Sequence, residues 1–172
     1  MNHIVLYHPE IPQNTGNIMR TCAASNMKLH LIEPLGFSLD KKAVRRSAAN
    51  YVEHVDYTVY QDWESFIKKN QDNGRFYFVT RYGQKAPNQM DFSEQDKDIY
   101  VIFGSESSGM PKSILRPHLE RCLRIPMTDK VRSLNLSNTV AVLAYEILRQ
   151  QDYNDLFRFE PESLKGKDWL LK

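Results

Sequence analysis

The 172-residue sequence has few cysteines and no long apolar run. Its two cysteines, Cys22 and Cys122, lie far apart, so we expect reduced, buried thiols and no disulfide framework. No stretch approaches the about 18 apolar residues that a membrane helix needs, which predicts no membrane span. The five histidines form no HExxH pattern and no close group with cysteine. A metal site is therefore not expected.

The sequence also lacks a strong excess of either charge. Lysine and arginine total 23 against 21 acidic residues, and a net charge of +2 does not by itself indicate a nucleic-acid-binding protein. Any such signal must be local. The 41% hydrophobic and 26% charged residues are typical of one compact globular domain. The opening MNHIVLYHPE lacks a basic region and a small-residue cleavage site, so we expect a cytoplasmic protein.

Patterns typical of strands and helices alternate along the chain. We expect strands at residues 3–8, 28–34, 54–60, 75–81, 98–104 and 122–127. The expected helices are 14–26, capped by Asn14, 40–51, capped by Asp40, then 62–70, 111–119 and a last one ending near residue 151. This alternation predicts an α/β fold, a single-domain, mainly parallel sheet flanked by helices. We expect the domain to span residues 1–151 and a C-terminal extension to span 152–172.

The last predicted helix has two different faces. Apolar residues recur at helical spacing along one face, and they are Val140, Leu143, Ala144 and Ile147. Val142, Tyr145 and Arg149 lie roughly opposite. Either the helix is simply amphipathic with a half-exposed tyrosine, or a partner subunit or a site uses the second face.

Three loops, VTRYGQ, FGSESSGMP and IPMTDKVRSLNLSN, follow predicted strands, where parallel sheets bind ligands. The second is not a phosphate loop, because Met110 and Pro111 follow Gly109 and Glu106 would repel phosphate. It is not a nucleophile elbow, since Glu106 stands where serine is needed. No GxGxxG occurs, which argues against a Rossmann dinucleotide site. A tight turn with a carboxylate at its apex remains, and a plain turn would equally explain Gly104 and Gly109.

Three segments resemble the motifs of the SPOUT class of RNA methyltransferases. They are NTGNIMR, FGSESSG, and IPM followed by SLNLSN. The opening IVLYHPEIPQNTGNIMR with LHLIEPLGF resembles the small branch that methylates the ribose 2′-hydroxyl of the tRNA wobble nucleotide, a cytidine or modified uridine. The resemblance runs from about residue 3 to 151. It implies a SPOUT fold with a C-terminal deep trefoil knot, in which residues 125–138 wrap the methyl donor S-adenosylmethionine.

The resemblance also implies a donor pocket. A neutral adenine needs backbone amides and an apolar slot, which Ile125, Met127 and Leu134 could supply without phosphate-binding glycines. Ordinary core residues are the alternative interpretation of Ile125 and Leu134. The residues that the resemblance places around the donor are Val79, Thr80, Gly104, Ile125, Met127 and Ser133.

For the acceptor, the resemblance implies that Arg20 acts at methyl transfer. Arginine stays protonated, so we favour an electrostatic clamp on phosphate or the developing alkoxide over base catalysis, and a solvated helix arginine is the plain alternative. We expect several polar side chains to orient the acceptor and the loops, namely Asn14, Asn17, Glu106, Ser133 and Asn135. Asn14 and Ser137 could instead be only helix caps. Tyr145 matches a tyrosine of the wobble-methylating branch and is expected in a site formed by a dimer.

Partners follow from the same resemblance, which implies tRNA as substrate and a symmetric homodimer with composite active sites. Two groups of basic residues suit phosphates, although such runs are often only solvated faces. They are Lys41, Lys42, Arg45 and Arg46, and Lys130 with Arg132. The alternatives are a SPOUT enzyme acting on another tRNA or ribosomal RNA nucleotide, and a noncatalytic RNA-binding module. A flavodoxin-like binding domain is disfavoured, because no phosphate loop follows the first strand.

Overall fold

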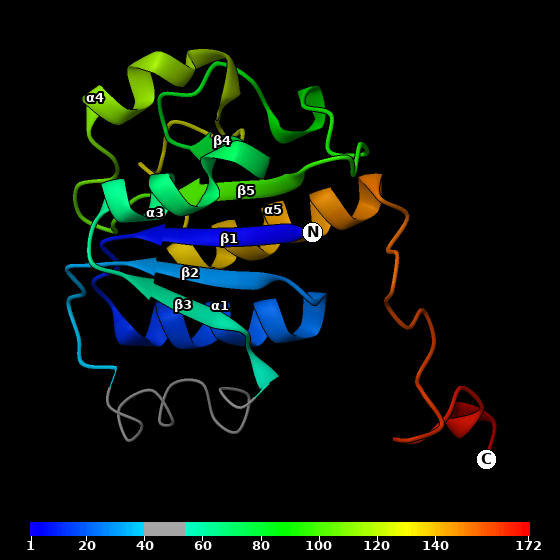
Figure 1. Ribbon diagram of the computed structural model, residues 1–172. Coiled ribbons are helices and arrows are strands. Elements are labelled where there is room, and N and C mark those ends of the chain that lie inside the picture. Colours follow the sequence, from blue (N-terminus) through cyan, green and yellow to red (C-terminus); the bar gives the residue numbers. More distant parts are fainter. Residues whose placement is uncertain (40–53) are drawn as a thin grey trace.

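The computed structural model describes residues 1–39 and 54–172 and shows a six-stranded sheet in the order β3-β2-β1-β5-β4-β6 (Figure 1). The strands are β1 Asn2–Tyr7, β2 Lys28–Ile32, β3 Tyr57–Tyr60, β4 Gly74–Val79, β5 Asp98–Phe103 and β6 Cys122–Leu123. Every neighbouring pair is parallel. The predicted α/β fold with a mainly parallel sheet is therefore confirmed.

Helices cover both faces of this sheet. They are α1 Pro12–Ser25, α3 Trp63–Asn70, α4 Lys112–Leu115 and α5 Leu136–Gln150. Short 3-10 helices occupy Gln71–Asn73, Pro87–Gln89, Arg116–Arg121 and Trp169–Leu171. α1 and α5 pack against each other over one face, and α3 and α4 cover the other (Figure 1).

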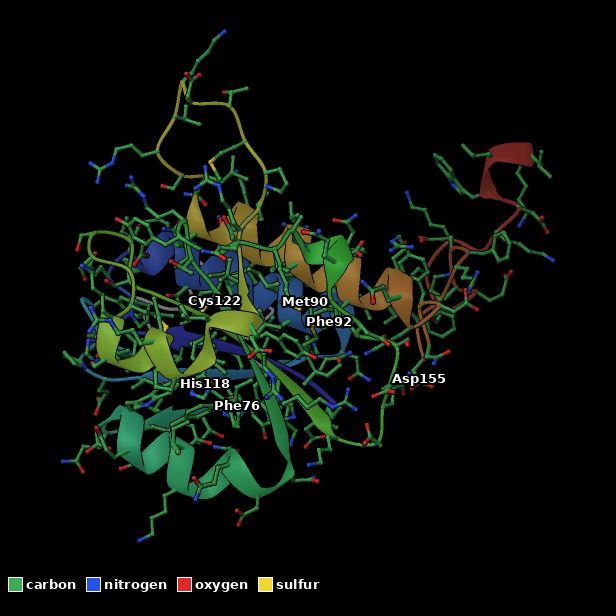
Figure 2. The ribbon with its side chains drawn as sticks, turned by 90° about the horizontal axis from the view of Figure 1, so that it is seen from above. Phe76, Met90, Phe92, His118, Cys122 and Asp155 are labelled. Atoms are coloured by element: carbon green, nitrogen blue, oxygen red, sulfur yellow. The ribbon has the colours of Figure 1, made fainter. Side chains whose placement is uncertain are left out.

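Successive strand residues feed two separate cores. Ile4 and Leu6 of β1 pack with α1 and α5, whereas Val5 between them packs on the α3 side. This follows from the two-residue period of a strand, and because helices cover both faces, the central strands are apolar on both sides. Figure 2 shows this side of the sheet from above, where Cys122 lies by α4 and Phe76 packs against Phe66 of α3.

The last long helix has the two faces that its sequence predicts. Val140, Leu143, Ala144 and Ile147 are fully buried, whereas Val142 and Tyr145 are each 47% exposed. Both cysteines are free and buried, as expected. Burial raises the pKa of the Cys22 thiol to about 12, so this thiol stays protonated. In the part of the chain that the structure describes, no helix is long and apolar enough to cross a membrane.

Several predicted boundaries differ from the structure. α1 begins at Pro12 with Ile11 as its cap residue, so Asn14 lies inside the first turn and is not the cap. The strand expected at 122–127 has only two residues, because the backbone N–H of Arg124 turns away to donate to the Lys85 carbonyl. The helix expected at 111–119 changes to 3-10 geometry at Arg116, immediately before a proline that cannot donate an α-helical hydrogen bond. The predicted helix 40–51 and its Asp40 cap lie outside the described residues.

The chain after α5 leaves the body of the protein (Figure 1). Tyr153 and Leu156 still pack against the first core, whereas Phe157, Phe159 and Leu170 are largely exposed. The division into a domain of residues 1–151 and an extension of 152–172 stays a prediction.

Candidate functional site

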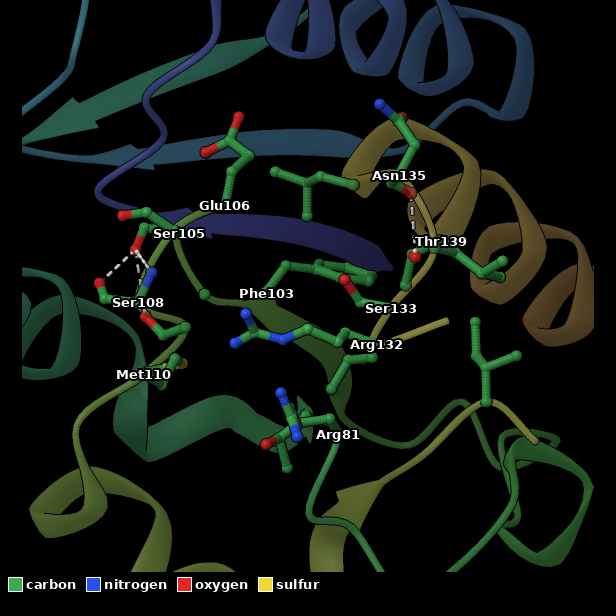
Figure 3. Close-up of a pocket in the computed structure, with 18 of the residues that line it drawn as sticks. Arg81, Phe103, Ser105, Glu106, Ser108, Met110, Arg132, Ser133, Asn135 and Thr139 are labelled. Atoms are coloured by element: carbon green, nitrogen blue, oxygen red, sulfur yellow. Dashed lines mark hydrogen bonds between the residues drawn. The ribbon is translucent and has the colours of Figure 1, made fainter. Parts of the chain in front are cut away.

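A cavity of about 670 Å³ opens at the carboxyl ends of β4, β5 and β6 (Figure 3). The three loops that follow these strands form it, as expected at this edge of a parallel sheet. Its volume lies within the range of small-molecule sites. All seven predicted donor-binding residues line it, namely Val79, Thr80, Gly104, Ile125, Met127, Ser133 and Leu134.

The cavity has an apolar floor. Phe103, at the end of β5, is 1% exposed, and the partly buried Val79 and Ile125 pack against the first core. Ile125 therefore contributes to both the core and the cavity lining. Leu134 is 39% exposed, so its alternative interpretation as ordinary core is wrong. An apolar floor of this kind suits the flat face of a neutral heterocycle.

A tight turn forms the β5 side of the cavity. The Ser105 N–H donates to the Gly109 carbonyl at 3.1 Å, and the Gly109 N–H donates to the Ser105 carbonyl at 2.9 Å. Gly109 has a φ of +68°, which favours glycine. A Cβ on Gly104 would lie 2.3 Å from the Gly109 carbonyl carbon. The predicted turn with a carboxylate at its apex is confirmed. Gly109 permits the positive φ, and Gly104 leaves room for the backbone of Gly109.

The carboxylate of that turn, Glu106, caps the start of α1. It accepts hydrogen bonds from the backbone N–H groups of Glu10 at 2.9 Å and Ile11 at 3.1 Å, and from Asn14 Nδ2 at 3.1 Å. The first turn of α1 has no acidic residue of its own. Glu106 therefore supplies the negative charge that the positive end of the helix dipole favours. In the other direction, the Glu10 carboxylate accepts hydrogen bonds from the Ser107 N–H at 3.0 Å and from the Ser107 hydroxyl at 2.6 Å.

Asn14 extends this network to the start of α5. Asn135 Nδ2 donates to Asn14 Oδ1 at 3.0 Å. Asn135 Oδ1 also accepts from the backbone N–H of Ser137 at 2.9 Å, so Asn135 and not Ser137 is the cap of α5. One chain of side chains, from Glu106 through Asn14 to Asn135, thus joins the three segments that carry the sequence motifs.

The opposite wall, residues 125–134, is built differently. It projects from the body in Figure 2, and residues 128–134 are exposed. Among the hydrogen bonds that join described residues, none involves 125–134. Arg132 lines the cavity and lies opposite Arg81 in Figure 3, whereas Lys130 is exposed outside the lining.

Three predicted acceptor residues lie outside this cavity. Arg20 and Asn17 are exposed on α1. Tyr145 lies on α5, beside a second hollow that Ala24 and Tyr153 also line. Because α1 and α5 are neighbours, all three lie on one pair of packed helices. Their roles stay predictions, and Lys41, Lys42, Arg45 and Arg46 lie outside the described residues.

Several residues of the cavity were not predicted from the sequence, and Arg81, Tyr82 and Arg124 are among them. For Arg81 and Tyr82 the signal was present in the loop VTRYGQ, where cationic and aromatic residues follow a strand end directly. Within residues 1–39 and 54–172, histidine, cysteine and acidic residues form no group of three or more that could hold a metal.

The chain is similar to known RNA methyltransferases. The model of the SpoU rRNA Methylase family matches residues 1–145. A Geobacillus stearothermophilus protein named tRNA (cytidine(34)-2'-O)-methyltransferase is 53% identical over 90% of this chain and 98% of its own. A Bacillus anthracis protein assigned as an RNA methyltransferase is 52% identical, with a TM-score of 0.86 over 91% of this chain and 98% of that one. A structure solved in work on the 2-OH methylation of C/U34 on tRNA is 39% identical, with a TM-score of 0.82 over 90% and 98% of the two chains.

Proposed function

Because the chain belongs to the SpoU rRNA Methylase family, we propose that it methylates the ribose 2′-hydroxyl of the tRNA wobble nucleotide, cytidine or modified uridine 34. S-adenosylmethionine is the methyl donor. The relative at 53% identity carries this activity in its name and is covered almost completely. The observation that carries the proposal furthest is the cavity in which the loops of all three motifs meet.

The cavity fits the donor by its chemistry. The partly buried Val79 and Ile125 and the buried Phe103 offer an apolar slot for adenine, and Gly104 lets the backbone come close. The network of Glu106, Asn14 and Asn135 holds these loops in place before any ligand binds. Preorganisation of this kind removes part of the entropy cost of binding.

The reaction forms one carbon–oxygen bond and breaks one carbon–sulfur bond. The ribose 2′-oxygen attacks the sulfonium methyl carbon in line, S-adenosylhomocysteine leaves, and the hydroxyl proton passes to solvent. A ribose hydroxyl is a weak nucleophile, so positioning and charge stabilisation are what the protein must supply. Arg20 supplies the positive charge beside phosphate or the developing alkoxide. Base action by Arg20 is disfavoured, since arginine keeps its proton.

A homodimer completes the site. Arg20, Asn17 and Tyr145 are outside the cavity of their own chain but share the packed pair α1 and α5. A second copy that docks on this pair brings these residues to its partner's cavity. Twofold dimers are the commonest oligomers. Lys130 and Arg132 contact tRNA phosphates, and so do the basic residues of 41–46. A tRNA substrate places the enzyme in the cytoplasm.

The test is methyl transfer from labelled S-adenosylmethionine to unmethylated tRNA, followed by nuclease digestion and mass mapping. We expect label on the ribose of nucleotide 34. Arg20→Ala should lower the rate by about a hundredfold or more, because it removes charge stabilisation of the transition state. Arg116→Ala, an exposed arginine beyond the other face of the sheet, is the matched control and should retain the wild-type rate.

Other outcomes are equally informative. Label on another nucleotide assigns the enzyme to a different tRNA or ribosomal RNA substrate. Absence of label with a broad RNA panel, despite donor binding, identifies a noncatalytic RNA-binding module.

A further inference from the structure

Tyr82 is an exposed aromatic side chain at the donor cavity. Among the described residues that line the cavity, the aromatic ones are Phe103 and Tyr82. Phe103 is 1% exposed and forms part of the floor, whereas Tyr82 is 73% exposed. Leaving a tyrosine ring in water forgoes the free energy that its burial would supply. A ring held in this position is available to a ligand larger than the cavity itself.

The turn that carries Tyr82 is firmly braced. The Thr80 N–H donates to the Leu123 carbonyl at 2.9 Å, and the Gly83 N–H donates to the Thr80 carbonyl at 3.1 Å. The Tyr82 N–H donates to the Thr80 hydroxyl at 3.3 Å. Gly83 lies so close to β6 that a Cβ there would be 2.4 Å from the Leu123 carbonyl carbon. The backbone below the exposed ring is therefore fixed in place, which lowers the entropy cost of using the ring for binding.

One cationic side chain lies beside the ring, and two more line the cavity. The Arg81 guanidinium carbon lies 5.1 Å from the centroid of the Tyr82 ring, within the range of a cation–π contact. The Arg124 guanidinium donates to the Arg81 carbonyl, and Arg132 lines the facing wall. All three arginines therefore line the same cavity as Tyr82.

This charge is matched to an anion and not to the methyl donor. The donor carries a sulfonium cation and an ammonium group against a single carboxylate, so its net charge is positive and three arginines exceed what it can pair with. The acidic residue of the lining is Glu106, and its carboxylate is already bonded to the backbone at the start of α1. Arginine forks suit phosphate oxygens, and aromatic rings beside them stack on unpaired bases. A single-stranded RNA segment carries both groups in every nucleotide.

We propose that Tyr82 stacks on an unpaired base next to the target nucleotide, while Arg81, Arg124 and Arg132 hold the adjoining phosphates. This inference rests on the proposed function and adds a positioning surface to it. RNA loops are recognised by proteins mainly through splayed bases stacked on aromatic side chains. Because every base has a π-face, Tyr82 positions the RNA strand without selecting one base over another. The stack fixes the ribose of the next nucleotide over the donor cavity.

The experiment compares tRNA affinity and kinetics in Tyr82 variants. Tyr82→Ala should raise both the KM for tRNA and the Kd for an isolated anticodon stem-loop by about tenfold or more, since each stacked base contributes on the order of that factor. The fall in kcat should be smaller than this rise. Tyr82→Phe keeps the ring and should restore most of the affinity. The Kd for S-adenosylmethionine, measured by calorimetry, should stay unchanged in both variants.

Phe159→Ala is the matched control, because Phe159 is 74% exposed but lies in the C-terminal tail. It should leave RNA binding unaltered. The inference is overturned if Tyr82→Ala binds RNA as tightly as the wild type, or if Phe159→Ala loses as much RNA affinity as Tyr82→Ala. It is also overturned if Tyr82→Ala weakens binding of S-adenosylmethionine and not of RNA. The stem-loop Kd needs no catalysis. A wild-type protein that binds the stem-loop through Tyr82 but transfers no methyl group would therefore contradict the proposed function alone.

Discussion

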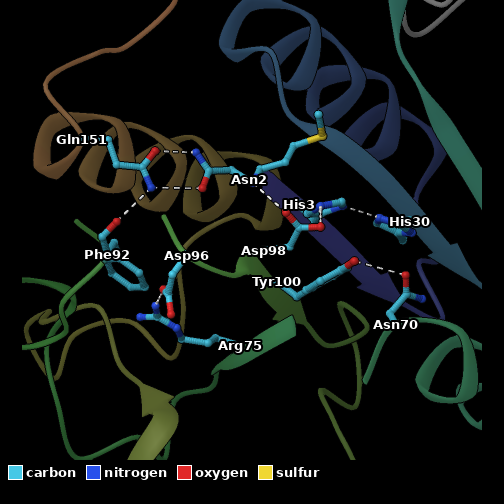
Figure 4. Close-up of polar contacts among 11 residues, drawn as sticks. Asn2, His3, His30, Asn70, Arg75, Phe92, Asp96, Asp98, Tyr100 and Gln151 are labelled. Atoms are coloured by element: carbon cyan, nitrogen blue, oxygen red, sulfur yellow. Dashed lines mark hydrogen bonds and ion pairs between the residues drawn. The ribbon is translucent and has the colours of Figure 1, made fainter. Parts of the chain in front are cut away.

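On the α3 side of the sheet, polar side chains bond to one another, whereas at the carboxyl ends of β4, β5 and β6 they surround an open cavity (Figures 3 and 4). His3 Nδ1 lies 2.8 Å from His30 Nε2, and His30 Nδ1 lies 3.1 Å from the Tyr60 hydroxyl. Asn70 Nδ2 donates to that hydroxyl at 3.3 Å, and its Oδ1 accepts a bond from Tyr100 at 3.2 Å. We call these five residues the histidine cluster. Both histidines are only 5% exposed.

The two regions differ in what their polar groups can still bind. In the histidine cluster each side chain bonds to another member, and the second ring nitrogen of His3 faces Asp98 Oδ2 at 3.4 Å. The cluster therefore contributes to stability and offers little to a ligand. At the carboxyl end, Glu106, Asn14 and Asn135 bond to one another but only to fix the loops around a space. The difference shows that polar networks can either close a core or hold a site open. Variants in each region should therefore separate stability from activity.

The largest effect is expected at the cavity. Glu106→Ala removes the acceptor of two backbone N–H groups and of Asn14. Hydrogen bonds to a charged group are each worth about 1.5–3 kcal/mol, so methyl transfer should fall by about a hundredfold as the loops lose their mutual position. Single-turnover rates would measure the loss of methyl transfer, and thermal unfolding would measure any loss of stability. Glu106→Gln keeps one acceptor oxygen and should lose less. Full activity in Glu106→Ala would show that the loops need no such link.

A smaller effect, on stability alone, is expected at the histidine cluster. Burial lowers the pKa of His3 from 6.5 to about 4 and that of His30 to about 3. Below pH 6.5 the unfolded chain binds protons that the folded protein does not, so the free energy of unfolding falls as the pH falls from 6.5 toward 4. The slope is at most about 1.4 kcal/mol per pH unit for each histidine. Urea unfolding at pH 7.5, 6.0 and 4.5 would measure it.

His30→Gln provides the control for that titration. Glutamine does not titrate, so the slope between pH 6.5 and 4.5 should be lower than in the wild type. The donor Kd at pH 7.5 should be unchanged, because His30 is absent from the cavity lining. An unaltered slope would exclude His30 as a source of the pH dependence.

The smallest effect concerns the two walls of the cavity itself. Residues 128–134 are exposed without hydrogen bonds to other described residues, whereas Ser105–Gly109 is bonded across its turn. Regions with few bonds open at low free-energy cost. Saturating S-adenosylmethionine should therefore slow amide hydrogen exchange more in 128–134 than in 105–109 or β1. Mass spectrometry of peptic fragments would measure this. Equal protection of both walls would show that residues 128–134 open no more easily than residues 105–109.

Much of the fold follows from sequence patterns that are local. The alternation of strands and helices predicts the parallel sheet, and the spacing of Val140, Leu143 and Ile147 predicts the buried face of α5. The seven predicted donor residues were named from the family resemblance, and all of them line the cavity. Glu106, Asn14 and Asn135 were also predicted site residues. Their bonding to one another was not predictable, since it joins positions far apart in the chain.

The sequence by itself determined which residues alternate between core and surface, and which loops are predicted to bind the donor. Only the tertiary structure decided how the loops close. The cap of α1 comes from Glu106 in the loop after β5 and not from Asn14, and β6 braces the turn that carries the exposed Tyr82. Periodicity arises from neighbours a few residues apart, which a sequence displays directly. Hydrogen bonds between distant loops depend on the folded path of the backbone, which no local pattern encodes.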